Sequence, residues 1–127
     1  MINCDSNIAS HNWSCVKSED PKGAEPIDVA KEFVAAIVGD DREAVERFLG
    51  GDQKLIDFIY GHPDATAFIR KTYQNITNWE QTYHSSGDAS IKILFDAEGQ
   101  SYGGGFEMTT VNQQINTGRM WVIRFIY

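Results

Sequence analysis

The sequence has 127 residues, of which 42% are hydrophobic and 12% aromatic, and its formal net charge is −7. These values are typical of one folded domain and exclude a largely disordered chain. An acidic surface disfavours binding to nucleic-acid backbones, whose counterions are replaced by lysine and arginine. It is typical of a soluble protein, and it can also steer a basic partner toward the surface.

The N-terminal segment carries few sizeable apolar side chains, and residues 1–25 are predicted to form an arm that docks through Trp13. Residues 26–127 are predicted to form a single domain. No apolar run approaches the roughly 18–20 residues of a membrane span, and the N-terminus lacks the basic and apolar regions of a signal peptide. We therefore expect a cytoplasmic protein in which Cys4 and Cys15 are reduced thiols.

In the first half of the domain, apolar residues recur at helical spacing between glycine, aspartate and proline breaks. Pro26 is expected to open the first helix, and Gly39 to end it in the left-handed conformation. Asp40 is the expected N-cap of a short second helix, with Glu43 completing a capping box. Asp52 is expected to cap a third helix, and one or two further helical turns follow before the strands begin.

From residue 75 onwards the apolar period changes from near 3.6 to 2, which indicates β-strands. Turns at residues 85–88, 96–99 and 116–118 separate four strands. Such regularly spaced turns are typical of an antiparallel meander. The predicted fold class is therefore α+β, with N-terminal helices packed on an antiparallel sheet.

The last strand, which begins at Arg119, is largely apolar in both of its alternating sets of side chains. One set is Trp121, Ile123, Phe125 and Tyr127, and the other is Met120, Val122 and Ile126, interrupted by Arg124. A strand that is apolar on both faces is expected inside a sheet. One face is then covered by helices, and the other faces an enclosed space. We therefore expect a strongly curved sheet that folds around the helices.

This order of elements resembles the NTF2-like (nuclear transport factor 2-like) superfamily over about residues 26–127. The resemblance is carried by Phe33 in the opening helix, the Gly39-Asp40-Asp41 step into residues 44–49, the Gly87-Asp88-Ala89 turn before residues 91–95, and the closing Met120-Trp121-Val122-Ile123. It implies a cone in which helices lie against a bent antiparallel sheet. Residues 52–74 exceed what many members have there, and the arm is unmatched. Because the superfamily includes isomerases, dehydratases, transport factors and binding domains, this fold does not decide the function.

An isomerase of this kind needs a carboxylate base and an oxyanion donor inside the cone. The candidate cavity residues are Tyr83, Arg124 and Asp57, with Tyr102 and Glu107 as further strand candidates. Each also has an ordinary structural interpretation. Glu107 is expected at solvent or the cone mouth, and Arg124 in an ion pair with Glu107 or Asp57 or at the open edge. No nucleophile motif is present, so we expect a protein without catalytic activity or cofactor.

The histidines and cysteines do not predict a metal site. Cys4 and Cys15 have only His11 between them, which is too few ligands for structural zinc. His62 and His84 lie in no metal-binding spacing.

The run Gly103-Gly104-Gly105 precedes a strand rather than a helix, so it does not predict a phosphate-binding loop. We expect a β-bulge or sharp bend that curves the sheet. The alternative is a flat surface that lets the backbone of a partner approach closely.

Two classes of function follow. The first is a non-catalytic binding protein, and the resemblance implies the NTF2-like immunity proteins of bacterial toxin systems, whose cognate toxins are often basic nucleases. The expected partner-binding residues are Asp96, Glu98, Tyr102, Gly104 and Glu107. The second class is a small-molecule enzyme or carrier that uses the cone cavity. A homodimer with a sheet-to-sheet contact is a further possibility.

Overall fold

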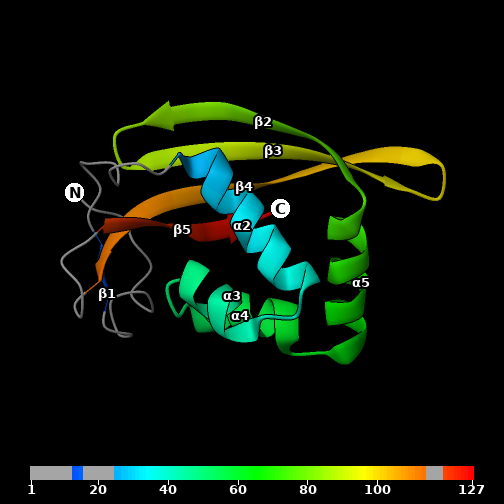
Figure 1. Ribbon diagram of the computed structural model, residues 1–127, viewed down its shortest axis with the longest axis horizontal. Helices are drawn as coiled ribbons and strands as arrows, with labels where there is room; N and C mark the ends of the chain where they lie inside the picture. The colour runs from blue at the N-terminus through cyan, green and yellow to red at the C-terminus, as the bar shows by residue number, and fades with distance from the viewer. Residues whose placement is uncertain (1–12, 16–24, 114–118) are drawn as a thin grey trace.

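The computed structural model describes residues 13–15, 25–113 and 119–127. Four helices are followed by four antiparallel strands, and a short N-terminal strand joins the same sheet (Figure 1). The elements are β1 (Trp13–Cys15), α2 (Pro26–Val38), α3 (Arg42–Phe48), α4 (Gln53–Tyr60), α5 (Pro63–Gln74), β2 (Ile76–Ser85), β3 (Asp88–Ala97), β4 (Gln100–Gln113) and β5 (Arg119–Ile126). The α+β class and the order of elements predicted from the sequence are confirmed.

The helix boundaries follow local capping residues, with one correction. Gly39 has φ −81° and is not left-handed. The left-handed residue is Asp40, at φ 58°, and the N-cap of α3 is Asp41, whose side chain accepts a hydrogen bond from the Ala44 N–H. The predicted cap was therefore displaced by one residue. Asp52 caps α4 as predicted, by accepting from the Lys54 N–H at 3.0 Å.

The strands β2, β3, β4 and β5 pair in sequence order as a meander, and the sheet is not closed into a barrel. β1 pairs with the far end of β4, through Trp13–Gln113 and Cys15–Val111. At this end of β4, β5 pairs with one edge of the strand. β1 therefore pairs with the opposite edge, which is the edge that β3 pairs with as far as Thr109. The predicted docking of the arm through the Trp13 side chain, and the state of Cys4, lie outside the described residues.

β5 is an edge strand that pairs with β4 alone among the described strands, so its predicted place inside the sheet was wrong. Its register contains a bulge, because Glu107 pairs with Phe125 while Met108 pairs with Ile123. Arg124 is the extra residue between these two pairs. A single unpaired residue reverses the alternation of side chains along a strand.

The bulge changes which side chains of β5 face the helices. Trp121, Ile123 and Ile126 lie on the helix-covered face, where they join the main core. Phe125 and Tyr127 lie on the outer face instead, and each is 56% exposed. The predicted set in which Phe125 and Tyr127 continue from Ile123 was therefore wrong beyond Arg124.

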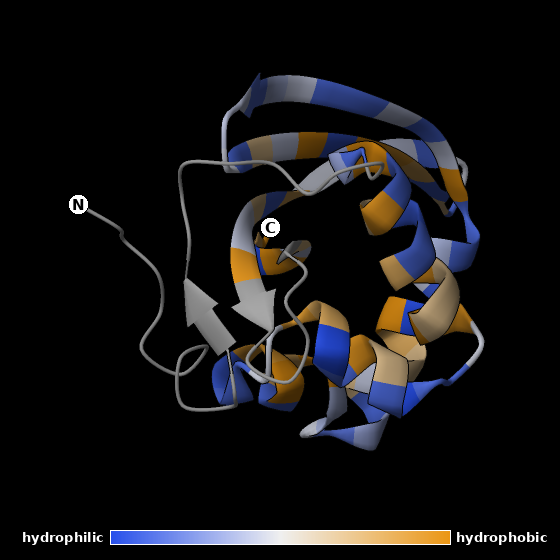
Figure 2. Ribbon diagram, turned by 60° about the vertical axis from the view of Figure 1, so that its left-hand side comes forward, coloured by the Kyte–Doolittle hydropathy of each residue, from blue (hydrophilic) through white to orange (hydrophobic). Residues whose placement is uncertain are grey.

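The core lies between the helices and one face of the sheet. Phe33 of α2 is fully buried and packs edge-on against Phe106 of β4, with ring centroids 5.7 Å apart. Tyr73 of α5 and Trp79 of β2 also contact the Phe106 ring, at 5.8 and 6.4 Å. In Figure 2, helices and sheet turn apolar segments toward one another. Side chains therefore occupy the space between α2 and the centre of the sheet.

A smaller apolar cluster lies on the opposite face of the sheet, where Val111 and Val122 are fully buried. Among the helices described, none is long and apolar enough to cross a membrane.

Candidate functional site

A groove of about 750 Å³ lies between α5 and the tip of the β3–β4 hairpin. Its wall on the α5 side is formed by one helical face, Phe68, Lys71, Thr72 and Asn75. The hairpin contributes Phe95, Asp96, Ala97, Glu98, Gly99 and Tyr102. Figure 1 shows this hairpin extending past α5 and beyond the end of β5.

Three aromatic rings give the groove its apolar surface. Phe68 is 69% exposed and Tyr102 is 44% exposed. The rings of Phe95 and Tyr102 stack with centroids 5.9 Å apart, which supports Tyr102 in its outward position. Large exposed aromatic side chains that are held in place are the usual anchors of protein interfaces.

Backbone contacts hold the two walls of the groove together. The Asp96 N–H donates to the carbonyl oxygen of Asn75 at 3.1 Å. The Asn75 side chain in turn donates to the Lys71 carbonyl oxygen at 3.0 Å, across the last turn of α5. The groove is therefore a built feature of the junction between helix and sheet.

The hairpin tip places acidic side chains at this groove. Ala97 pairs with Gln100, so Glu98 and Gly99 form a two-residue turn, with φ 53° and 77°. Two successive left-handed residues identify a type I′ turn, which normally carries asparagine or aspartate before glycine. Glutamate in this conformation is strained. Glu98 and Asp96 both line the groove and are exposed, with Lys71 as the one basic residue of the lining.

Of the five predicted partner-binding residues, the structure brings Asp96, Glu98 and Tyr102 together at the groove. Gly104 is buried on the helix-covered face, and a Cβ there would lie 2.8 Å from the Tyr127 carbonyl oxygen. Glu107 lies on the outer face and accepts a hydrogen bond from the Ser90 hydroxyl. These last two residues are not part of the groove.

The bulge expected at Gly103–Gly105 is absent, because the register of β3 and β4 continues through these residues. Gly105 instead makes room for Tyr127. The two residues exchange backbone hydrogen bonds at 3.0 and 3.1 Å. A Cβ on Gly105 would overlap the Ile91 carbonyl oxygen and lie 2.7 Å from the Tyr127 hydroxyl. Burial, and then the Glu107 carboxylate, raise the pKa of Tyr127.

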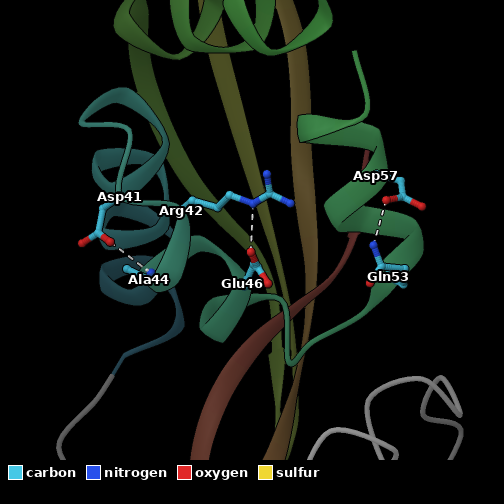
Figure 3. Close-up of polar contacts among 6 residues, drawn as sticks. All are labelled: Asp41, Arg42, Ala44, Glu46, Gln53 and Asp57. Atoms are coloured by element: carbon cyan, nitrogen blue, oxygen red, sulfur yellow. Dashed lines mark hydrogen bonds and ion pairs between the residues drawn. The ribbon is translucent and has the colours of Figure 1, made fainter. Parts of the chain in front are cut away.

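The three predicted cavity residues are exposed and lie apart from one another. Asp57 is on the outer side of α4, where it accepts from the Gln53 side chain at 2.8 Å (Figure 3). Tyr83 donates to the Ser85 hydroxyl on β2. Arg124 stands at the bulge of β5. The expected ion pair with Glu107 or Asp57 does not form within the described chain. Figure 3 also shows the exposed ion pair of Arg42 with Glu46, at 2.9 Å.

The sequence did not single out Phe68 or Phe95. Both lie on apolar stripes that predict core positions, but Phe68 is exposed, and α5 contributes only partly buried side chains to the core. The available signal was the spacing of residues 68, 71, 72 and 75, which places them on one face of a helix.

A second, smaller set of polar atoms lies at the other end of the helix-covered face. Trp121 Nε1 and Gln81 Oε1 are buried and lack a hydrogen-bond partner in the described structure. His84 links them: its Nδ1 is 3.3 Å from Gln81 Nε2, and its ring is edge-on to Trp121 at 5.7 Å. No group of three His, Cys, Asp or Glu side chains suited to a metal ion occurs in the described ranges.

The chain matches no protein-family model, no curated protein and no solved structure. Its function is therefore inferred from the geometry of the described residues.

Proposed function

We propose that this protein is a non-catalytic binding protein that holds a basic segment of another protein in the groove between α5 and the β3–β4 hairpin. The observation that carries the proposal is the lining of the groove, in which exposed Phe68 and Tyr102, the latter stacked on Phe95, occur together with exposed Asp96 and Glu98. Aromatic anchors supply binding energy. Complementary charge raises the association rate and selects the partner.

The net charge of −7 supports a basic partner. A diffuse negative potential steers a cationic protein toward the surface over distances comparable to the Debye length, about 8 Å at physiological salt. Once the partner is close, the aromatic side chains of the groove provide the direct contact.

The specific form that we propose is an inhibitor of a bacterial toxin, of the NTF2-like immunity type. The support is the resemblance in element order and the acidic character, together with a meander that follows the helices. We also propose that the sheet has the cone geometry of that superfamily. The bulge at Arg124 and the register shifts of β2 are features that bend a sheet.

The test is co-expression with the product of the adjacent gene, followed by purification of the complex and a growth-protection assay. We expect a stable complex and protected growth. Phe68→Ala and Tyr102→Ala should each weaken binding by about tenfold or more, as for interface anchors. Phe58→Ala is the matched control, because Phe58 is an aromatic residue of α4, 55% exposed, that does not line the groove. A complex that none of the groove substitutions weakens would contradict the proposed site.

The alternative proposal is an enzyme or carrier that binds a small molecule on the helix-covered face of the sheet. The observation in its favour is the pair of unpartnered buried atoms Trp121 Nε1 and Gln81 Oε1, a donor and an acceptor near His84. A bound ligand that satisfies them would raise the melting temperature. A thermal-shift screen in which hits lose their effect in Gln81→Leu would favour this function over protein binding.

A further inference from the structure

Among the residues that the structure describes, β4 has a backbone edge without a partner beside the groove. Gly105 exchanges both of its backbone hydrogen bonds with Tyr127, so its N–H and C=O point away from β3. Backbone groups alternate in direction along an antiparallel strand. Those of Gly103 and Ser101 therefore point the same way as those of Gly105, whereas Tyr102 and Gly104 face β3.

The described residues place no strand beside Ser101 and Gly103. The pairing of β5 with β4 reaches Gly105 and Tyr127, and β4 continues from there to the hairpin tip. Figure 1 shows this part of the hairpin extending beyond the end of β5. Ser101, Tyr102 and Gly103 are all exposed. Within the described ranges, two N–H groups and two C=O groups in the plane of the sheet therefore face no neighbouring strand.

This edge lacks the features that normally prevent strand addition. Natural edges are protected by charged side chains, proline or bulges. The segment Gln100-Ser-Tyr-Gly-Gly104 has no charge and no proline, and its register with β3 is regular. An unprotected edge with glycines is where another backbone can approach closely.

Gly103 is the one glycine of the run that the fold itself does not require. Cβ atoms at Gly104 and Gly105 would meet the backbone or ring of Tyr127, whereas a Cβ at Gly103 would find only Leu94 Cδ2, at 3.9 Å. Its φ is also not in the left-handed region. The chain therefore has room for a larger residue at this position.

We infer that the edge of β4 at Ser101 and Gly103 receives an extended, positively charged segment of a partner protein, which adds to the sheet as a further strand. The inference rests on the proposed binding function and specifies how the partner is held. Main-chain hydrogen bonds provide affinity in strand addition, and alternate side chains provide specificity. Side chains of the added segment that point to the helix-covered face lie beside Tyr102 and the groove.

Charge identifies the occupant. Glu98 lies in the turn at the end of this edge, and Asp96, which pairs with Ser101, lies across β4 from it; both are exposed. Lys71 is the one basic residue in the lining of the groove. A segment in which basic residues alternate with apolar ones places its cations near Asp96 and Glu98 and its apolar side chains against Phe68 and Tyr102.

The probe is a short fluorescein-labelled peptide of alternating lysine and valine, compared with a peptide in which glutamate replaces lysine. We expect the lysine peptide to bind and the glutamate peptide not to bind. On binding, the amide protons of Ser101 and Gly103 should gain protection from hydrogen exchange, while that of Tyr102, already bonded to β3, changes little. Equal binding of both peptides, or no protection at Ser101 and Gly103, would overturn the inference.

Gly103→Pro removes an edge N–H without removing a hydrogen bond to β3, and Gly103→Ala is the control that keeps the N–H. Loss of a backbone hydrogen bond with the added steric block should weaken peptide binding by about tenfold, and the control should bind within about twofold of the parent protein. Ser101→Pro is a second variant with the same logic. Thermal unfolding verifies that each variant is folded.

The outcomes separate this inference from the proposed function. If the peptide and the neighbouring gene product bind, and Phe68→Ala weakens both while Gly103→Pro weakens neither, strand addition is wrong and the groove proposal stands. If Phe68→Ala and Gly103→Pro both leave binding of the gene product unchanged, both proposals are wrong. If the free protein forms dimers and Gly103→Pro dissociates them, the edge holds a second copy of this chain instead.

Discussion

The ring of Phe33 in α2 meets the ring of Phe106 in β4 edge-on, with 5.7 Å between centroids and an interplanar angle of 87°. This contact joins the first helix to the central strand across the core. We expect Phe33→Ala and Phe106→Ala each to reduce the free energy of unfolding by about 3–5 kcal/mol. In the double variant, the loss should fall short of the sum by about 0.5–1.5 kcal/mol, the value of an aromatic pair. Urea denaturation measures all three, and strict additivity would contradict a direct interaction.

Gly103 and Gly105, two residues apart on one strand, should respond oppositely to alanine. Gly105→Ala drives a Cβ into the Ile91 carbonyl oxygen and the Tyr127 ring and should destabilise the fold by about 1–3 kcal/mol. Gly103→Ala makes only an ordinary contact with Leu94 Cδ2 and restricts the unfolded chain, so it should be neutral or stabilise by up to about 1 kcal/mol. Thermal denaturation of the two variants side by side measures the difference. Similar melting temperatures would show that Tyr127 does not lie over Gly105.

The strained turn residue Glu98 allows stability and binding to be separated. Asparagine is favoured at the first position of a type I′ turn, so Glu98→Asn should stabilise the protein by about 0.5–1 kcal/mol. The same substitution removes a negative charge from the groove and should slow association with the basic peptide. Stopped-flow binding and thermal denaturation give the two values. A variant that is both more stable and an equal binder would indicate that the Glu98 carboxylate does not contribute to recognition.

The entry to α3 predicts another pair of opposite effects. Asp41→Ala removes the N-cap acceptor of the Ala44 N–H and should cost about 1 kcal/mol. Asp40→Gly relieves a left-handed aspartate and should be neutral or slightly stabilising. Chemical denaturation of the two variants tests the assignment. If Asp40→Gly were the more damaging change, the cap would belong to Asp40 instead.

The buried phenol of Tyr73 makes stability depend on alkaline pH. Burial raises the pKa of Tyr73 above its ordinary value of 10.0. The unfolded chain therefore ionises near pH 10 while the folded protein keeps the phenol neutral. The contribution to stability is complete below about pH 10 and is lost as the pH rises through the folded-state pKa.

Tyr73→Phe should accordingly lose less free energy of unfolding than the parent protein between about pH 8 and about pH 11. Urea denaturation at both pH values measures this loss. Tyr83→Phe is the control, since Tyr83 is exposed on β2. Equal losses in the parent protein and Tyr73→Phe would mean that Tyr73 does not couple ionisation to unfolding.

The elements could be predicted because their signals are local. Pro26, Asp52 and the glycine-containing turns act within a few residues, and the observed boundaries follow them closely. The bulge of β5 could not be predicted, because its position depends on how Arg124 aligns with a strand elsewhere in the chain. Phe68 escaped notice for the same reason. The spacing of residues 68, 71, 72 and 75 places them on one helical face, but whether that face is covered depends on the rest of the fold.

Arg124 has a consequence for how this chain can vary. Because it is the unpaired residue of β5, it sets the phase of every side chain that follows it. If Arg124 were paired in a regular ladder and did not bulge, Phe125 and Tyr127 would turn toward the helices and Ile126 outward, with no change in their identity. The bulge, and not the composition of the strand, therefore decides which aromatic rings of β5 meet the solvent.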